Sequence, residues 1–529
     1  MCFPSFSSNL RTFTMFTHIF LVLLLTISFL IDARPAPRGF LINCGSSENI
    51  TVRNLKFIAD EGLISVGNTT ALKMSGVLPV LSTLRLFPDV SARKYCYVLP
   101  AVKGTKYLVR TTYYYGGFDG GNQPPIFDQI VDGTKWSVVN TTDDYANGLA
   151  SYYELVVAAH MNELSVCLAR NQHTGKSSPF ISALEVMFLG DSVYGGIDFD
   201  KYVLHTVARK CFGAAEPISF PDDEFHRFWQ PFKDTNPTVT CQSNVTPSDF
   251  WNMPPVKALK NAITTSRGKT LQIQWLPVSL PPSNYYISLY FQDNRNPSAY
   301  SWRVFNISIN GELFYSKLNV TAKGVSVYAI EWPLSGQTRM TLIPEDGIPV
   351  GPLINAAEVL QILPLGGMTL TRDVMAMEDL ARSLDNAPAD WHGDPCLPQQ
   401  NSWTGVTCSG EKNVARVVTL NLTSMGLTGS LPPSIVNLTA VNNIWLAHNK
   451  LSGLIPDISS LKVLETFHLD NNQFEGSIPK SLGELPRIQE IYLQHNNLEG
   501  EVPESLRNRP DVDIRLTPRN NLRESKNNG

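Results

Sequence analysis

The sequence predicts a mainly β fold: two tandem β-sandwiches followed by a short right-handed solenoid, with one strand and one turn or 3-10 segment per repeat. From about residue 38 to 365, short runs rich in Tyr, Val, Ile and Phe alternate with Gly, Pro, Asn and Asp turns, as is typical of sandwich strands. Near the C-terminus the pattern Leu-x-Gly-x-hydrophobic-Pro occurs four times, once with Phe for Leu. A repeat of this kind indicates stacked solenoid units.

The N-terminus is interpreted as a signal peptide, residues 1–33. Arg11 and His18 precede an apolar run from residue 19 to 31, which is too short to span a bilayer and suits a signal-peptide core. The alternative is a buried N-terminal helix. No later segment is apolar enough to cross a membrane, so we expect no membrane insertion of the mature chain.

Eight Asn-x-Ser/Thr sequons predict a glycosylated extracellular protein. They are Asn49, Asn68, Asn140, Asn244, Asn306, Asn319, Asn421 and Asn437. The net charge of -4 gives no reason to expect nucleic acid as a partner. We expect a secreted protein of the extracellular space or cell wall, whose association with the outer face of the plasma membrane would run through a partner.

A second, weaker repeat divides the β-rich region. Residues 181–186 (Ile-Ser-Ala-Leu-Glu-Val) resemble residues 354–359 (Ile-Asn-Ala-Ala-Glu-Val), 173 positions later. Strand-like runs at residues 107–115 and 285–291 precede the two motifs by similar distances. We therefore predict two related sandwiches, residues 38–200 and 201–365.

This region resembles the malectin-like ectodomain of plant receptor kinases. The resemblance rests on residues 42–45, 94–97, 107–110, 115–120, 124–128, 228–231 and 305–310, together with Trp136. It implies two malectin-like folds, each a jelly-roll-like β-sandwich.

Residues 366–413 are predicted to cap the open end of the solenoid core. Thr371 is expected to cap a helix over about residues 372–384, which has an apolar stripe, and Cys396 is expected to pair with Cys408. Residues 393–396 (Gly-Asp-Pro-Cys) lie between the two regions. The order of parts resembles the ectodomain of symbiosis-type leucine-rich repeat (LRR) receptor kinases.

The LRR array is predicted over residues 414–522, with four to five repeats and a polar tail at 523–529. Its strand cores are 420–422, 444–446, 467–469, 491–493 and a degenerate 514–516. Asn449, Asn472 and Asn496 are expected to satisfy backbone groups of the turns, whereas Met425 departs from this pattern in the first repeat.

The concave face of this array is the first candidate binding surface. The central residue of each strand core should point to that face, which gives a column of Asn421, Trp445, His468, Tyr492 and Arg515, with Asp470 and Gln494 beside it. Trp, Tyr and Arg dominate interface hot spots. The alternative is an ordinary solvated strand face. A glycan on Asn421 would cover only the N-terminal edge of the column.

An aromatic cluster in the first sandwich is the second candidate, because sugars bind aromatic faces with a carboxylate that fixes the hydroxyl groups. The candidates are Tyr113, Tyr114, Tyr115, Phe118 and Asp119, with Trp302 in the second sandwich. The alternative is core packing, because alternation along a strand buries every second ring.

The sequence shows no catalytic pattern. It contains no phosphate-binding Gly-rich loop followed by Lys, no kinase strings, no Gly-x-Ser-x-Gly elbow and no metal-ligand spacing among its nine His residues. We therefore expect no enzyme, no metal and no cofactor. The sandwiches contain an odd number of cysteines: Cys44, Cys96, Cys167, Cys211 and Cys241. At least one thiol is therefore unpaired, and which cysteines pair with one another stays open.

These features favour a recognition protein. It would bind a cell-wall oligosaccharide, a peptide or a receptor-kinase ectodomain, and act as a co-receptor or soluble modulator of cell-surface signalling. The alternatives are an extracellular enzyme acting on cell-wall glycan and a structural wall protein without a specific ligand.

Overall fold

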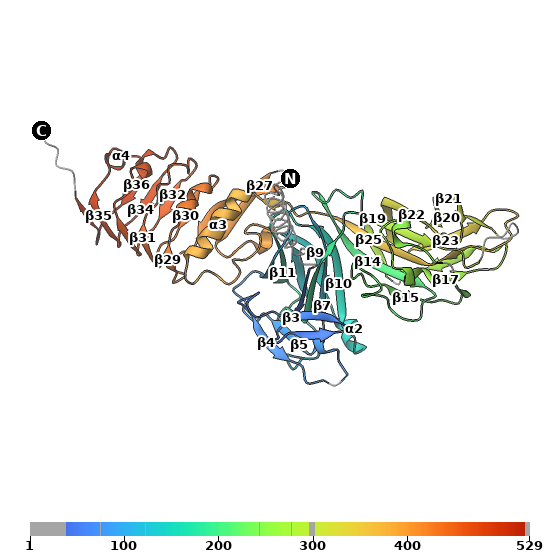
Figure 1. Ribbon diagram of the computed structural model, residues 1–529. Coiled ribbons are helices and arrows are strands. Elements are labelled where there is room, and N and C mark those ends of the chain that lie inside the picture. The colour runs from blue at the N-terminus through green and yellow to red at the C-terminus, as the bar shows by residue number, and fades with distance from the viewer. Residues whose placement is uncertain are drawn as a thin grey trace, which may run out of the picture.

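The computed structural model describes residues 39–523 apart from positions 75, 122, 243, 277, 296–301 and 412. The predicted signal peptide and residues 524–529 of the predicted tail lie outside the described residues. Figure 1 shows three parts in a row, with the first sandwich between the repeat array and the second sandwich. Strands dominate, as expected.

One sheet runs through both sandwiches. Its central strands alternate Tyr, Val and Leu with smaller or charged residues and are buried on both faces for most of their length, whereas its edge strands are partly exposed. The order is β2 (Ile50–Val52), β3 (Leu55–Ala59), β1 (Gly39–Asn43), β13 (Ala183–Leu189), β7 (Lys106–Tyr113), β10 (Ser151–Ala158), β14 (Tyr202–Phe212), β25 (Ala356–Pro364), β19 (Leu280–Phe291) and β22 (Val325–Gly336), with β15 (Gln230–Phe232) beside β14. The two sandwiches meet where β10 pairs with β14.

Two smaller sheets complete the first sandwich and enclose its core with the shared sheet. They are β6 (Tyr95–Pro100), β11 (Glu163–Arg170), β8 (Phe127–Val131) and β9 (Thr134–Val139), and then β12 (Phe180–Ile181), β5 (Thr83–Leu86) and β4 (Asn68–Ala71). A disulfide joins Cys96 to Cys167 across the β6–β11 pair. Cys44, Cys211 and Cys241 are buried free thiols, and burial raises the pKa of each.

The second sandwich repeats this plan. Its smaller sheets are β16 (Thr238–Thr240), β17 (Asn261–Thr264) and β24 (Leu353–Ile354), and β18 (Leu271–Gln274), β23 (Arg339–Pro344), β20 (Arg303–Ile309) and β21 (Glu312–Val320). The short helical elements of the two sandwiches are α2 (Thr142–Ala146), η1 (Pro79–Leu81), η2 (Pro247–Asp249) and η3 (Val256–Leu259). The predicted repeat holds in space, because Glu185 of β13 and Glu358 of β25 are both buried and both bind an arginine.

The cap consists of helix α3 (Thr371–Ser383), η4 (Gln399–Asn401) and strand β27 (Val406–Glu411), with the predicted Cys396–Cys408 disulfide formed. The predicted capping role of Thr371 was wrong, because Thr371 is the first helical residue and Leu370 precedes it without a side-chain cap. In the first turn, the Asp373 carboxylate accepts hydrogen bonds from Arg416 and from the backbone N–H of Val417, which ties the helix to the first strand of the array.

The repeat array has five in-register parallel strands, and β26 (Met368–Thr369) extends the sheet on the cap side. They are β28 (Val414–Asn421), β30 (Asn443–Trp445), β32 (Thr466–His468), β34 (Glu490–Tyr492) and β36 (Asp513–Arg515). A second sheet contains β29 (Thr428–Ser430), β31 (Lys450–Leu454), β33 (Gln473–Gly476), β35 (Asn497–Glu501) and β37 (Asn521–Arg523), and the connecting turns contain η5 (Pro433–Asn437), η6 (Lys480–Glu484) and α4 (Glu504–Arg507).

The asparagine side chains of the repeats form the predicted hydrogen bonds to backbone groups of the turns. Asn449 Nδ2 donates to the carbonyls of Leu422 and Leu446, and Asn449 Oδ1 accepts from Leu427 N–H. Asn520 makes the same kind of contacts in the last repeat, although its sequence context is degenerate. Met425 stands at this position in the first repeat and is exposed.

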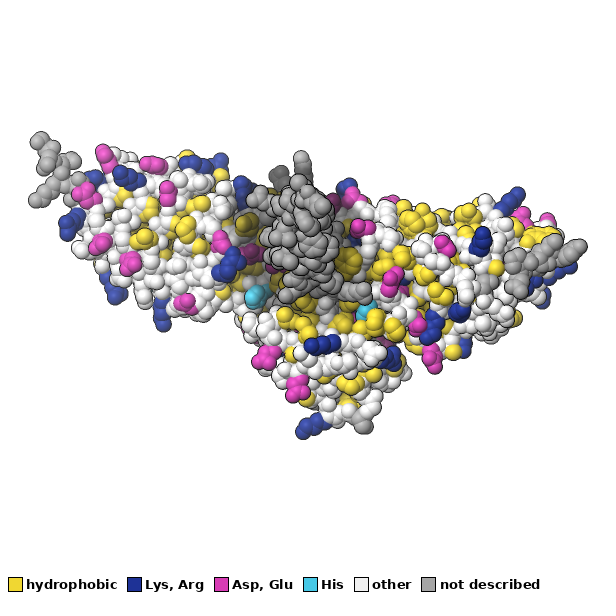
Figure 2. Space-filling view, in the orientation of Figure 1, with side chains coloured by type: hydrophobic (Ala, Val, Ile, Leu, Met, Phe, Trp, Pro, Cys, Tyr) yellow, Lys and Arg dark blue, Asp and Glu magenta, His cyan; other side chains and the backbone are white. Residues whose placement is uncertain are grey.

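Within the described residues, each helix is too short or too polar for a membrane crossing. On the face drawn in Figure 2, Lys and Arg side chains are interspersed with Asp and Glu. This mixed surface offers no extended field of one sign on that face.

Candidate functional site

The predicted column on the repeat array is brought together by strand register. Asn421 pairs with Trp445, Trp445 with His468, His468 with Tyr492, and Tyr492 with Arg515. Because successive side chains of a strand point to opposite faces, the leucines on either side face the core while this column faces outward. The column is therefore a single line of side chains that crosses five repeats.

Four members of the column form a continuous stack, here called the aromatic ladder: Trp445, His468, Tyr492 and Arg515. The ring centroids of Trp445 and His468 are 6.2 Å apart, and those of His468 and Tyr492 are 4.1 Å apart with an interplanar angle of 11°. The Arg515 guanidinium lies 4.1 Å from the Tyr492 ring centroid, within the range of a cation–π contact. Since the ring faces cover one another, the ring edges are the part left for a partner.

Each ring of the ladder is also tied to the next repeat. Trp445 Nε1 donates to Thr466 Oγ1 at 2.6 Å, His468 Nε2 lies 2.9 Å from Glu490 Oε2, and Tyr492 donates its hydroxyl to Asp513 Oδ2 at 2.8 Å. These three partners occupy the same strand position, two residues before the next ladder residue. The repetition fixes the ring planes, so the ladder is ordered without a ligand.

Charged groups flank the C-terminal half of the ladder. Partial burial and the hydrogen bond to Asp513 raise the pKa of Tyr492 to about 12, whereas the bond from Arg515 lowers the pKa of Asp513. On the other side lie Asp470, which is buried, and Gln494, whose buried Oε1 has no partner among the described residues. The surface thus combines ring edges with the carboxylates of Glu490 and Asp513.

The sequons differ in how they present their amide nitrogen. Seven of the eight asparagines are exposed, including Asn421 at the start of the column and Asn437 in η5. Asn306 is the exception, because it is half-buried and its Nδ2 donates to Glu345 Oε1 at 2.6 Å. Glycan attachment at Asn306 would replace one of the two Nδ2 hydrogens and place the sugar beside the Glu345 carboxylate.

The aromatic cluster of the first sandwich lies in the core. Tyr113, Tyr114 and Tyr115 are buried, and Tyr115 and Phe118 both pack near Phe180. A sugar could not stack on the three tyrosines without displacing them, which agrees with the packing alternative. Asp119 is exposed, but its carboxylate accepts bonds from Tyr115, Ser177 and the Gly121 N–H. Trp302 is 44% exposed and stays a predicted sugar contact.

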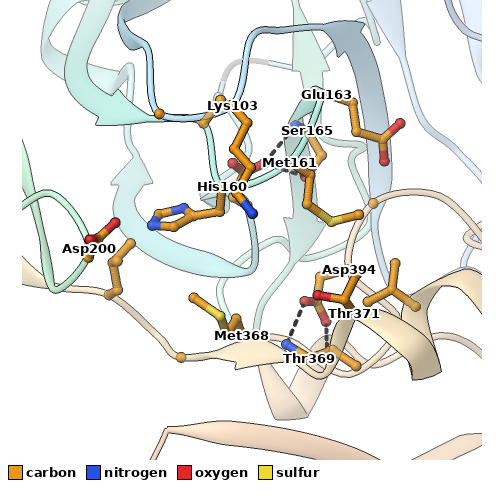
Figure 3. Close-up of a pocket in the computed structure, with 17 residues that line it drawn as sticks. Lys103, His160, Met161, Glu163, Ser165, Asp200, Met368, Thr369, Thr371 and Asp394 are labelled. Atoms are coloured by element: carbon orange, nitrogen blue, oxygen red, sulfur yellow. Dashed lines mark hydrogen bonds between the residues drawn. The ribbon is translucent and has the colours of Figure 1, made fainter.

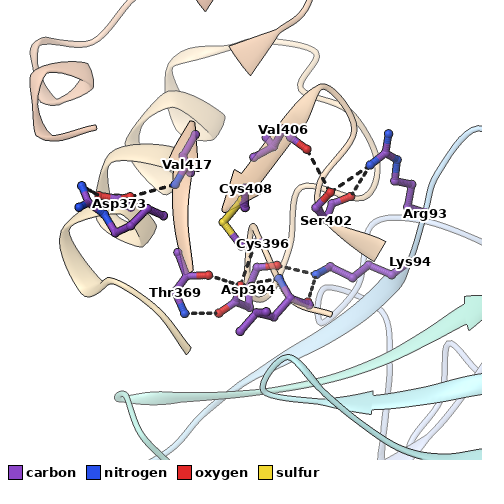
Figure 4. Close-up of a disulfide and its surroundings, with 12 residues drawn as sticks. Arg93, Lys94, Thr369, Asp373, Asp394, Cys396, Ser402, Val406, Cys408 and Val417 are labelled. Atoms are coloured by element: carbon purple, nitrogen blue, oxygen red, sulfur yellow. Dashed lines mark hydrogen bonds and ion pairs between the residues drawn. A yellow bond between two sulfur atoms is a disulfide. The ribbon is translucent and has the colours of Figure 1, made fainter. Parts of the chain in front are cut away.

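The sequence did not predict how the first sandwich holds the cap. Lys94, which is 1% exposed, donates from Nζ to the carbonyls of Asp394 and Leu397. Its neighbour Arg93 donates to Ser402 Oγ at 3.0 Å. Figure 4 shows both side chains reaching from the sandwich into the loop beside the disulfide. Burial lowers the pKa of Lys94 to about 8.

A cavity of about 300 Å³ lies beside this junction. Figure 3 shows Lys103, His160 and Glu163 of the first sandwich facing Met368, Thr371 and Asp394 of the cap. Asp132 also lines the cavity and accepts from Ser165 N–H at 2.8 Å. Burial, with Asp394 and Glu163 nearby, raises the pKa of Asp132 to about 7. No motif marks these residues, because they come from separate strands, turns and a helix.

Comparison with family models divides the chain as its geometry does. The Malectin-like domain model matches residues 42–362, the Leucine rich repeat N-terminal domain model matches 370–409, and the Leucine Rich Repeat model matches 463–485 and 487–508.

Comparison with known proteins finds receptor kinases. Two probable LRR receptor-like serine/threonine-protein kinases of Arabidopsis thaliana are 30% identical over 446 and 488 residues, which cover 81% and 84% of this chain. The chain spans 49% of the length of each.

Solved structures show a similar fold over the sandwiches. The ANXUR1 extracellular domain of A. thaliana covers 61% of this chain, over 97% of its own length, with 17% identity and a TM-score of 0.50. The plant receptor-like kinase FER covers 61%, over 96% of its own length, with 18% identity and a TM-score of 0.51. A complex of the plant peptide RALF23 with FER and LLG2 contains a chain that covers 62% of this one, over 96% of its own length, with 18% identity and a TM-score of 0.50.

Proposed function

Because the chain belongs to the malectin-like domain family and carries a leucine-rich repeat array after that domain, we propose that it is an extracellular recognition protein whose aromatic ladder binds a peptide or the ectodomain of a partner. In this role it acts as a co-receptor or modulator of cell-surface signalling. The ladder is the observation that carries the proposal.

Pre-ordering favours a binding role for the ladder. Ordering a flexible side chain at an interface costs about 0.5–1.5 kcal/mol, and stacking with cross-repeat hydrogen bonds meets much of that cost in the free protein. Trp, Tyr and Arg are also the residues most enriched among interface hot spots. A solvated strand face needs neither the stacking nor these residue types.

The distribution of sequons agrees with this surface. Asn421 and Asn437 are the last two sequons of the chain, so residues 438–522 carry none. A glycan on Asn421 would border the ladder on the side of the cap and leave the line from Trp445 to Arg515 open. Removing that glycan should widen access to the ladder and should not abolish binding.

The comparisons favour a protein or peptide partner in general. The relatives are named as receptor-like kinases, and one protein of similar fold is described in a complex with a peptide and a further protein. The buried tyrosines of the first sandwich give less support to a sugar at that cluster. We therefore place a peptide or ectodomain before an oligosaccharide.

The test is binding of the secreted full chain to plant extracellular peptides and receptor-kinase ectodomains, compared with Trp445→Ala and Tyr492→Ala variants. Truncation of a hot spot costs 2 kcal/mol or more, so affinity should fall about 30-fold. Leu454→Ala is the matched control, because Leu454 is 66% exposed on β31 of the other sheet. It should bind like the wild type.

Unchanged binding in both ladder variants would refute the role of the ladder. Hydrolysis of a cell-wall glycan that is lost on substitution of a carboxylate would instead establish the enzyme alternative. A chain that binds none of the tested ectodomains, peptides or oligosaccharides would favour a structural wall protein.

A further inference from the structure

A buried ionic network crosses the line where the two sandwiches meet. Its seven charged residues, each at most 9% exposed, are Arg110, Glu154, Glu185, Arg209, Asp223, Arg227 and Glu358. Four are carboxylates and three are guanidiniums. The network therefore has one more negative charge than positive charges. A buried charge without a counter-charge is costly.

The hydrogen bonds show where the imbalance lies. Both oxygens of Glu154 accept from arginines, and both oxygens of Glu358 accept from an arginine or a tyrosine hydroxyl. Both oxygens of Asp223 likewise have donors. Glu185 accepts one bond, from Arg110 Nη1 to Oε2 at 2.8 Å. Within the described part of the chain, Glu185 Oε1 receives none.

Glu185 lines a cavity of about 310 Å³ on the outer face of the shared sheet. The floor leaves room for a ligand because Thr112 of β7 and Ala183 of β13, which pair in register, are small. The neighbouring row pairs Arg110 with Glu185, so the ion pair forms one end of the floor. Glu185 therefore lines the cavity at that end.

Aromatic rings form much of the remaining wall. Phe57 and Tyr152 come from the sheet, and Phe220 and Phe228 come from the segment between β14 and β15. Tyr152 and Phe228 meet edge to face with centroids 5.2 Å apart. Arg53 lies at the cavity as well, is exposed, and forms no ion pair among the described residues. The cavity is apolar along its sides, and its charged side chains are Arg53, Arg110 and Glu185.

We propose that this cavity is a second recognition site, which takes a basic side chain, arginine or lysine, of a partner polypeptide. The charged end of that side chain meets Glu185 Oε1 and balances the network, and its aliphatic stem lies between the aromatic walls. Cations over aromatic faces are attracted to the ring quadrupole, and long basic side chains bury their stems in this way. The site is independent of the aromatic ladder, which lies on the repeat array.

The test uses the full secreted chain and ligand-observed NMR with Nα-acetyl-arginine amide. The neutral control ligand is Nα-acetyl-citrulline amide, which has nearly the same shape without the charge. The arginine probe should bind with a dissociation constant on the order of 1 mM and about tenfold more tightly than the citrulline probe. The lysine probe should bind and its neutral norleucine counterpart should bind more weakly.

Three variants locate the site. Glu185→Gln keeps an acceptor for Arg110 but removes the unbalanced charge, and Ala183→Leu fills the floor without touching the network. Thr112→Leu fills the same floor from a half-buried position, should Ala183→Leu fail to fold. Each should lose the preference for arginine over citrulline, with its melting temperature as the test of folding. Glu312→Gln, an exposed carboxylate on β21, should keep it.

Equal binding of arginine and citrulline by the wild type would overturn the charge argument. Unchanged arginine binding in folded Ala183→Leu and Thr112→Leu would place the probe elsewhere and overturn the site. Absence of arginine binding up to about 10 mM would overturn the proposal as a whole. None of these results depends on the ladder, so the two proposals fail separately.

Discussion

Replacing Asp394 by alanine should loosen the cap and the start of the repeat array. The Asp394 carboxylate accepts hydrogen bonds from the backbone N–H groups of Cys396 and Leu397, each at 2.8 Å. It also accepts from the backbone N–H and the hydroxyl of Thr369. One side chain therefore ties the disulfide loop to strand β26, and its own backbone carbonyl accepts from Lys94.

The magnitude follows from those contacts. Two N–H groups in the loop lose their acceptor, at about 1–3 kcal/mol each, and the bonds to Thr369 contribute about 1 kcal/mol each at most. These ranges sum to about 2–8 kcal/mol, and values in their lower half give about 4 kcal/mol. The melting temperature of a unit of about 150 residues shifts by about 2–4 °C per kcal/mol. The melting temperature of the cap and array should therefore fall by about 10 °C.

Calorimetry of the full chain and amide exchange at Cys396 and Leu397 measure this effect. Asp394→Asn keeps an acceptor for the loop N–H groups, so its melting temperature should fall by less than half as much as that of Asp394→Ala. Asp385→Ala is the matched control, because Asp385 is exposed near the end of the same cap helix. A shift below about 2 °C in Asp394→Ala, with unchanged exchange at both amides, would show that the carboxylate does not hold the loop.

Three further predictions concern the junction, the disulfide and a sequon. Burial raises the pKa of Asp132 from 3.8 to about 7, so the folded state retains a proton that the unfolded chain has released, and stability should fall by about 2–4 kcal/mol as pH rises from about 4 to 7. Asp132→Asn should remove most of that fall, and equal pH slopes by chemical denaturation would contradict the assignment. Replacing both Cys396 and Cys408 by serine should cost about 3 kcal/mol in the loop-entropy model, read from the same calorimetric transition, and an unchanged transition would mean that the bond adds nothing. Glycopeptide mass spectrometry should find Asn421 occupied and Asn306 largely unmodified, because Asn306 Nδ2 is bonded to Glu345, and full occupancy at Asn306 would show that this bond yields during synthesis.

The repeat array was predictable from sequence because its determinants are local and periodic. The spacing fixes which residue of each strand faces outward, and parallel register then brings Trp445, His468 and Tyr492 into one line. The sequence did not predict that the rings stack, or that Thr466, Glu490 and Asp513 hold them. Those contacts join positions 21 or 22 residues apart, and only the pitch of the solenoid brings them together.

The sandwiches were harder to interpret. Alternation correctly predicted that rings along residues 113–115 would be buried on one face, but the other face is covered too, so Tyr114 packs in a separate small cluster. The sequence predicted two sandwiches and did not predict their shared sheet, because the β10–β14 pairing involves strands whose partners depend on tertiary contacts. The Lys94 contacts span about 300 positions, a separation at which no local pattern operates.

The two internal junctions differ in physical character, and this difference predicts where the molecule moves. The sandwiches share backbone hydrogen bonds and a buried ionic network, so separating them would expose unpaired strands and charges at once. The first sandwich holds the cap through hydrogen bonds that involve the side chains of Arg93, Lys94 and Thr134, and cavities of about 300 and 460 Å³ flank Gly393 within that interface. Local opening follows the path that breaks the fewest buried contacts. The repeat array should therefore pivot against the paired sandwiches, with residues 365–370 as the hinge, and a partner that engages both the ladder and the Glu185 cavity would fix that angle.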